Sequence, residues 1–194
     1  MAGNKRAIIV GIPGVGKTTV ITRAAELLSK KHNATVVTYG TLMFEEAQKL
    51  GVKDRDEMRR LSVERQRQLQ ESAARRIAEM KNDVVIVDTH LFISTVEGYY
   101  PGLPMRLMTI MNPTNLIMVA AEPAQIAERR KNDPTRKRDE ASAEAIKNDL
   151  DISKMMLASC SVLTGAPFAV VLNDDGKVDE AAEAIARILG AEMK

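Results

Sequence analysis

The sequence predicts an α/β fold in which helices flank a five-stranded parallel sheet. Five short apolar or β-branched runs recur along the chain, and stretches with helical periodicity separate them. The first run leads directly into a glycine-rich loop. Runs that are hydrophobic throughout suit strands buried on both faces, and strands that alternate with helices form right-handed βαβ units.

The expected strands are defined by their nearly continuous hydrophobicity. They are AIIV at 7–10, TVVT at 35–38, VVIV at 84–87, LIMVA at 116–120 and FAVVL at 168–172. The first expected helix, residues 17–31, follows the first strand and its glycine loop. Its apolar residues recur at the spacing of one helix face, at Val20, Ile21, Ala24, Leu27 and Leu28.

Residues 39–82 interrupt the alternation, because they contain no strand candidate but several helical stretches. Asp54 with Glu57 resembles a capping box, and Ser62 with Glu64 in the first turn marks another helix start. The sequence therefore predicts an all-helical insertion within the single domain that a chain of 194 residues favours.

The last third of the chain contains three more expected helices. Pro123 begins one helix, and Asp133-Pro134 ends it within a short, polar and strongly basic segment. The remaining two helices are expected at residues 140–163 and 177–189.

Composition excludes several classes of protein. Hydrophobic residues make up 45% and charged residues 28%, as in a soluble globular domain, and no stretch approaches the roughly 18 apolar residues of a spanning helix. A net charge of +2 and 3% aromatic residues disfavour a nucleic-acid or membrane-surface binder. The single cysteine, Cys160, with only His32 and His90 beside it, excludes an internal disulfide and disfavours a zinc site, so we expect a cytoplasmic protein.

GIPGVGKT at 11–18 matches the phosphate-loop pattern G-x-x-x-x-G-K-[ST], and it has the required strand before it and helix after it. The backbone N–H groups of such a loop and the start of the following helix bind an anion. Lys17 is placed to reach the β and γ phosphates, and Thr18 to place its hydroxyl on Mg²⁺. The expected phosphate-binding residues are Gly11, Ile12, Pro13, Gly14, Val15, Gly16, Lys17, Thr18 and Thr19.

Asp88 ends the apolar run VVIVD, which is the form of a Walker B element whose carboxylate holds Mg²⁺. In an open parallel sheet, ligands gather at the carboxyl ends of the strands. We therefore expect Asp88 beside the glycine loop.

Two arginine groups admit a structural and a functional interpretation. Arg129, Arg130, Lys131, Arg136, Lys137 and Arg138 form either a solvated face or a cluster that neutralises transferring phosphates. Arg55, Arg59 and Arg60 form either an exposed helix face or a clamp for an acceptor phosphate. His90 either orients a nucleotide or caps the turn after Asp88, and the tyrosines of GYYPGLP, a turn-rich loop at 98–104, line a base pocket or pack on the core.

The chain resembles the archaeal-type adenylate kinase family along essentially its whole length. The resemblance is carried by IIVGIPGVGKTTV, VVTYGTLMFEEAQKLG, KDRDEMRRLSVERQRQLQ, DTHLFIST, GYYPGLP and DPTRKRD, in collinear order. It implies a P-loop kinase fold, with residues 39–80 as the domain that binds the nucleoside monophosphate and residues 131–139 as a short basic lid. It also implies ATP, AMP and Mg²⁺ as ligands and a homotrimeric assembly.

The resemblance extends to individual residues. It implies that Gly11 to Thr19 bind the ATP phosphates and that Arg130, Arg136 and Arg138 surround the transferring phosphoryl group. Bacterial and muscle-type relatives place an acceptor arginine where this chain has Phe44, and DTHLFIS contains no arginine either. The remaining candidates for the acceptor site are Arg55, Arg59, Tyr39, Thr41 and His90.

The reaction implied is the reversible, in-line transfer of a phosphoryl group from ATP to AMP, giving two ADP. Two alternatives remain open from the sequence: a kinase for another monophosphate or small acceptor, and a nucleotide-gated switch. The N-K-x-D stretch of guanine-nucleotide switches does not occur in the sequence.

Overall fold

A computed structural model describes residues 4–132 and 142–190, and it confirms the predicted α/β fold. Five parallel strands lie in the order β2-β3-β1-β6-β7. They are β1 (Lys5–Val10), β2 (Ala34–Thr38), β3 (Val84–Asp88), β6 (Asn115–Ala120) and β7 (Phe168–Leu172), which are the five runs predicted from hydrophobicity. The two edge strands, β2 and β7, expose alternate side chains, whereas β3 and β6 are buried throughout.

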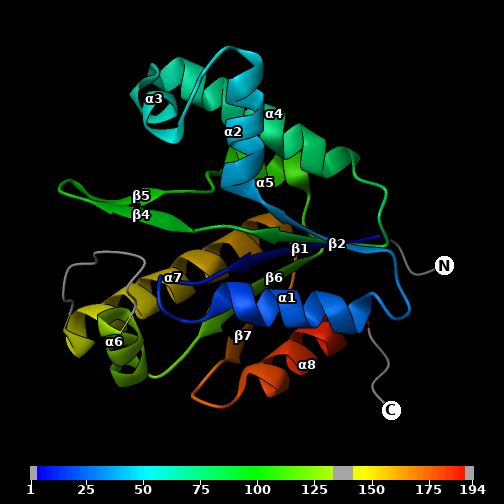
Figure 1. The fold of residues 1–194 in the computed structure, drawn as a ribbon, viewed down its shortest axis with the longest axis vertical. Helices are drawn as coiled ribbons and strands as arrows, with labels where there is room; N and C mark the ends of the chain where they lie inside the picture. The colour runs from blue at the N-terminus through cyan, green and yellow to red at the C-terminus, as the bar shows by residue number, and fades with distance from the viewer. Residues whose placement is uncertain (1–3, 133–141, 191–194) are drawn as a thin grey trace.

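Helices cover both faces of the sheet, as Figure 1 shows. Helices α1 (Lys17–Leu28) and α8 (Val178–Ile188) pack together on one face. The other face is covered by α4 (Val63–Glu79), α5 (Met105–Met111) and α7 (Ala143–Thr164), and α6 (Pro123–Lys131) packs against α7. In the described part of the chain, no helix is long and apolar enough to cross a membrane.

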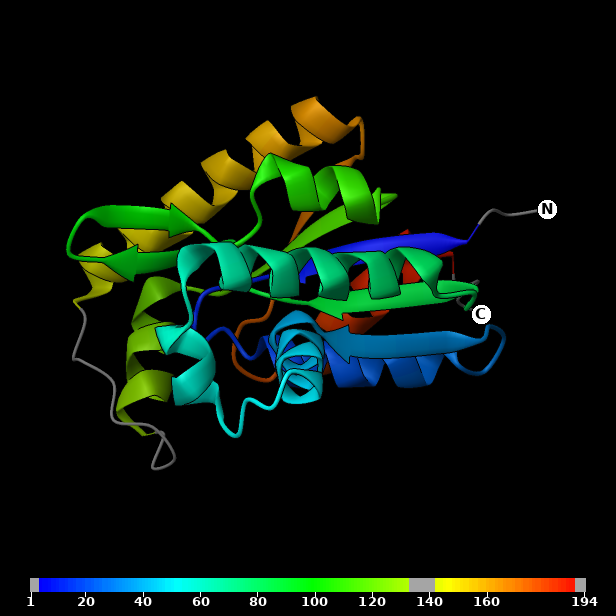
Figure 2. The same cartoon turned by 90° about the horizontal axis from the view of Figure 1, so that it is seen from above.

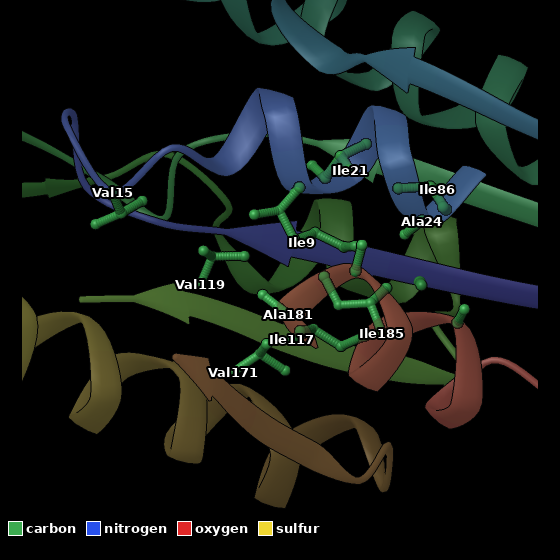
Figure 3. Close-up of a cluster of buried hydrophobic side chains, with 14 of the residues drawn as sticks. Ile9, Val15, Ile21, Ala24, Ile86, Ile117, Val119, Val171, Ala181 and Ile185 are labelled. Atoms are coloured by element: carbon green, nitrogen blue, oxygen red, sulfur yellow. The ribbon is translucent and has the colours of Figure 1, made fainter. Parts of the chain in front are cut away.

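Two apolar clusters hold the helices to the sheet. Figure 3 shows the first, in which Ile9 and Ile117 of the sheet meet Ile21 of α1 and Ile185 of α8. The second lies on the opposite face, between the sheet and α4, α5 and α7. Alternate residues of β1 contribute to the two clusters, because successive side chains of a strand point to opposite faces.

The helical insertion consists of α2 (Tyr39–Lys49), α3 (Arg55–Arg60) and α4, as predicted. Asp54 caps α3 by accepting a hydrogen bond from the Glu57 N–H at 2.7 Å, and the Glu57 carboxylate accepts one from the Lys53 N–H at 2.7 Å. The insertion also has an apolar cluster of its own, formed by Ala47, Val52, Met58 and Leu69. Its helices α2 and α4 also contribute to the second cluster, so the insertion is packed on the sheet as well as on itself.

One prediction about this part of the fold was wrong. Residues 98–104 were expected to form a turn-rich loop, but Gly98–Pro101 form strand β5, which pairs with β4 (Phe92–Thr95) in an antiparallel hairpin. The hairpin extends from the carboxyl end of the sheet beside α7 in both views (Figures 1 and 2). Most of the predicted lid, including Arg136 and Arg138, lies outside the described residues.

Candidate active site

The glycine loop, residues 11–16, joins the end of β1 to the start of α1. Gly14 and Gly16 have φ values of 94° and 77°, which side chains other than glycine rarely adopt. Gly16 is the N-cap of α1 and provides no side chain to cap it, so the first-turn N–H groups are available to an anion. The loop thus has the backbone geometry that the motif predicts.

Lys17 and Asp88 form an ion pair at the floor of this loop. The Lys17 Nζ donates hydrogen bonds to the Asp88 carboxylate and, at 3.0 Å, to the Thr89 carbonyl. Strand β3 pairs with β1 so that Asp88 lies opposite Ile9, which places the carboxylate beside the loop as predicted. Both side chains are about nine-tenths buried, and burial lowers the pKa of Lys17 to about 8. Lys17 is therefore held by Asp88 in this structure.

Arg130 of α6 reaches the outer side of the same loop. Its Nε donates a hydrogen bond to the Pro13 carbonyl at 2.8 Å. A Cβ added to Gly14 would approach the Arg130 Cγ to 3.0 Å, so a larger residue at this position would push the arginine away. Its neighbour Arg129 has a different role, because it binds the Asp175 carboxylate at 2.6 Å and the Asn173 carbonyl at 2.9 Å. The structure thus separates two arginines that the sequence presented as one cluster.

The two acceptor candidates on α3, Arg55 and Arg59, have different surroundings in the insertion. Arg55 donates to the Thr41 hydroxyl at 3.1 Å, and its guanidinium lies over the Phe44 ring, 5.5 Å from the centroid. Arg59 instead pairs with Asp56 at 2.8 Å on the exposed surface. Arg55 therefore lies with Thr41 and Phe44 of α2, and Arg59 does not.

Tyr39 was predicted to bind substrate, and the structure places it in the core at the start of α2. Only 4% of its surface is exposed, and its hydroxyl donates to the Gln70 carbonyl of α4 at 2.6 Å. Burial raises its pKa. Tyr39 belongs to the core between α2 and α4, because this hydrogen bond satisfies its one polar group there.

His90 and Tyr99 occupy the segment that follows β3. His90 is exposed and lines a small cavity of about 30 Å³ together with Gly11, Ile12 and Pro13, which is room for a water molecule and not for a base. Tyr99 packs edge-on against Phe92, donates to Asp149 at 3.0 Å and accepts from Asn148 at 2.8 Å. Tyr99 thus ties the hairpin to α7.

Sequence reasoning missed Asn173, the first residue after β7. It is 2% exposed, and its Nδ2 donates to the Val15 carbonyl of the glycine loop at 2.8 Å. No spacing pattern links two residues this far apart in the chain. The only available signal was the position of an asparagine at the carboxyl end of a buried strand, where ligands gather in such sheets.

Comparisons with known proteins agree with this geometry. A family model described as an AAA domain matches residues 10–147. An adenylate kinase from Thermoplasma acidophilum is 43% identical over 188 residues, covering 96% of this chain and all of its relative. The chain belongs to the adenylate kinase family. An adenylate kinase from Methanocaldococcus jannaschii is 40% identical and covers 96% of this chain, so the archaeal resemblance seen in the sequence is confirmed.

Solved structures confirm the fold of this adenylate kinase family member independently. A shikimate kinase from Bacteroides thetaiotaomicron superposes with a TM-score of 0.57 at 14% identity, covering 95% of this chain and 98% of its own. A shikimate kinase from Aquifex aeolicus gives a TM-score of 0.52 at 18% identity. At such identities the likeness concerns the P-loop kinase fold alone.

Proposed function

We propose that the protein catalyses the reversible, Mg²⁺-dependent transfer of a phosphoryl group from ATP to AMP, giving two ADP. The observation that carries the proposal is the convergence of Lys17, Asp88 and Arg130 on one glycine loop, in a chain about 40% identical to adenylate kinases over nearly its whole length. Arg55 and Thr41 add a second anion-binding group on the insertion.

The donor nucleotide binds through its phosphates. The N–H groups of the glycine loop and of the first turn of α1 hold the triphosphate, and Lys17 neutralises its β and γ oxygens. Binding requires Lys17 to turn from Asp88 toward the phosphates. The charge that Lys17 leaves on Asp88 is then available for a cation.

The residues present fit Mg²⁺ in the form that this ion adopts with nucleotides. Thr18 is exposed in the first turn of α1, and Asp88 ends the neighbouring strand. Among the described residues, no group of three or more acidic, histidine or cysteine side chains forms a metal site. Mg²⁺ commonly takes one or two protein oxygens and completes its shell with phosphates and water. When bound, it neutralises charge on the phosphate oxygens.

The acceptor phosphate binds to Arg55, with the Thr41 hydroxyl beside it. An oxygen of the AMP phosphate attacks the γ-phosphorus in line, the bond to the β–γ bridging oxygen breaks, and its electron pair leaves with ADP. The attacking phosphate is already an anion, so no side chain needs to remove a proton. Positioning and charge neutralisation therefore supply the catalysis.

Arginine side chains stabilise the charge on the transferring group. Arg130, which lies at the loop, contacts the equatorial oxygens together with Arg136 and Arg138 of the predicted lid. Closure of this segment and of the insertion, the nucleoside-monophosphate domain at 39–80, excludes water that would otherwise take the phosphoryl group.

Family resemblance supports two further parts of the proposal, a cytoplasmic location and a homotrimer. The trimer is tested by light scattering, which should give three times the 21.3 kDa of one chain. A mass of one chain at micromolar concentration would exclude it.

The function is tested by measuring ADP formation from ATP and Mg²⁺ with a panel of acceptors. AMP should be used far better than UMP, CMP or an alcohol such as shikimate. Equal or better use of UMP would assign the enzyme to another monophosphate. ATP hydrolysis that is slow and indifferent to AMP would instead favour the nucleotide-gated switch.

A further inference from the structure

We propose that Asn173 is a positioning residue that holds the glycine loop in its anion-binding conformation and joins it to helix α6. The proposal rests on the proposed function in so far as the loop is taken to bind the phosphates of ATP. Asn173 belongs to neither the glycine motif nor the arginine cluster. It follows β7 and lies beside the loop only because β7 pairs with β6, which in turn pairs with β1.

The contact with Val15 fixes one peptide plane of the loop. The Asn173 Nδ2 donates to the Val15 carbonyl, and a Cβ built on Gly16 would clash with the same Nδ2. In a trans peptide the C=O and the following N–H point in opposite directions. A Val15 carbonyl drawn toward Asn173 therefore aims the Gly16 N–H away from Asn173, toward the side on which the triphosphate is proposed to bind.

Side-chain donors occupy two carbonyl groups of the loop. Arg130 binds the Pro13 carbonyl at 2.8 Å, and Asn173 binds the Val15 carbonyl at the same distance. A loop that binds an anion must present its N–H groups and turn its carbonyl oxygens away. These two carbonyl oxygens therefore point to protein donors and not to the anion.

The other half of the amide shows which of its groups the position requires. Among the described residues, the Asn173 Oδ1 is buried without a hydrogen-bond partner. A buried acceptor without a partner costs free energy that an apolar side chain of the same shape would not. The Oδ1 therefore gives no reason for an asparagine at this position. The Nδ2 does, because its hydrogen bond to the Val15 carbonyl stabilises the glycine loop.

The backbone of Asn173 extends the link to α6. Its N–H donates to the Ala120 carbonyl of β6 at 2.7 Å, and its carbonyl accepts from Arg129 at 2.9 Å. Arg129 precedes Arg130, the residue that reaches the outer side of the loop. One residue thus connects the loop, the end of β6 and the helix that carries a proposed catalytic arginine.

Two substitutions test the role of the donor. Asn173→Ala removes the side chain, and Asn173→Leu keeps its shape while removing both the donor and the buried acceptor. Each leaves the Val15 carbonyl without its partner, so we expect the KM for ATP to rise about tenfold, as for loss of one buried hydrogen bond. The KM for AMP should change less than twofold. Asn173→Leu should lower the thermal midpoint less than Asn173→Ala does, because leucine fills the space of the side chain and the buried acceptor is removed as well.

Asn115→Ala is the matched control. Asn115 is also a buried asparagine, 7% exposed, but it begins β6 at the opposite end of the sheet and accepts from Thr114 at 2.9 Å. Its loss should lower the thermal midpoint without changing either KM. An equal rise in the KM for ATP in Asn115→Ala and Asn173→Ala would mean that general destabilisation is responsible, and would overturn the positioning role.

Binding of inorganic tripolyphosphate, measured by calorimetry on the full chain, separates the two proposals. This probe has phosphates but no base, so it reports on the loop alone. If the wild-type protein binds neither tripolyphosphate nor ATP, the proposed function fails. If the wild type binds and both Asn173 variants bind equally well, only the positioning role fails. A loss of about tenfold in both variants, and none in Asn115→Ala, supports it.

Discussion

Lys17 and Asp88 illustrate how one pair of residues serves both folding and function. Each is nearly buried, and an isolated buried charge is expensive unless a partner of opposite sign lies beside it. The ion pair provides that partner. An incoming Mg²⁺–triphosphate carries both signs of charge, so it can replace each partner with a new one. The charges that stabilise the fold are thereby available to the substrate.

Lys17→Met separates these two roles. We expect kcat to fall by roughly a thousandfold, as for loss of a main charge-stabilising group. We also expect about 3–5 kcal/mol less free energy of unfolding, because Asp88 remains buried without a cation. Adding Asp88→Asn should restore much of the stability, measured by urea unfolding, but no activity. Recovery of turnover in the double variant would show that Lys17 acts only through Asp88.

Arg55→Ala and Arg59→Ala form a matched pair on the same helix. Arg55 lies with Thr41, whereas Arg59 pairs with an exposed aspartate. Loss of a charged hydrogen-bond donor is worth about 1.5–3 kcal/mol, so Arg55→Ala should raise the KM for AMP by roughly tenfold or more. Arg59→Ala should leave it within twofold, and steady-state kinetics with varied AMP decide. A larger rise in the KM for AMP in Arg59→Ala than in Arg55→Ala would place the acceptor phosphate at Arg59 instead.

Motif residues were predictable because a contiguous pattern specifies their geometry. Lys17, Asp88 and Arg130 lie where the strand, loop and helix order places them. Arg55 and Arg59 could not be distinguished, because spacing along a six-residue helix does not say which face meets α2. The burial of Tyr39 was not predictable either, since it depends on α4, a separate element. Asn173 was missed for the same reason, because its partner is in β1's loop and not nearby in the chain.

Among the elements, hydrophobicity identified all five strands of the parallel sheet and missed the β4–β5 hairpin. The parallel strands are buried and read as apolar runs. The hairpin is mostly exposed, includes Gly98 and Pro101, and turns at Val96–Glu97 without the Asn-Gly or Asp-Gly signal of a tight turn. Tyr99 ties the hairpin to α7 through hydrogen bonds with Asp149 and Asn148, which no local pattern reveals.

Tyr99→Phe tests that dependence on α7. The variant keeps the edge-on packing against Phe92 and loses the hydrogen bonds to Asp149 and Asn148. Because the hydroxyl contacts are exposed, we expect a loss of about 1 kcal/mol or less in the free energy of unfolding. Hydrogen exchange of the β4 and β5 amides should accelerate while exchange in β1 and β3 stays unchanged. Uniform acceleration across the sheet would instead mean that the hairpin is part of the main cooperative unit.

In the molecule as a whole, the donor and acceptor groups belong to two parts that share an apolar cluster, because Leu42 of α2 and Ala74 of α4 pack with the sheet. The glycine loop is built on the sheet and its two apolar clusters. Arg55 and Thr41 belong to the insertion, which has a cluster of its own around Met58 and Leu69. A ligand that contacts both parts therefore adds to the contacts between the insertion and the sheet, whereas ATP alone needs only the loop.

A dinucleotide in which five phosphates join two adenosines should stabilise the protein through both parts at once. At a hundred times its Kd, a ligand adds about 2.7 kcal/mol, which for a domain of this size raises the thermal midpoint by roughly 5–11 °C. At equal concentration the dinucleotide should raise the midpoint more than ATP does. Arg55→Ala should lose this excess and keep the ATP shift, whereas Lys17→Met should lose both. If Arg55→Ala retained the full shift, the acceptor phosphate would have to bind elsewhere than at the start of α2.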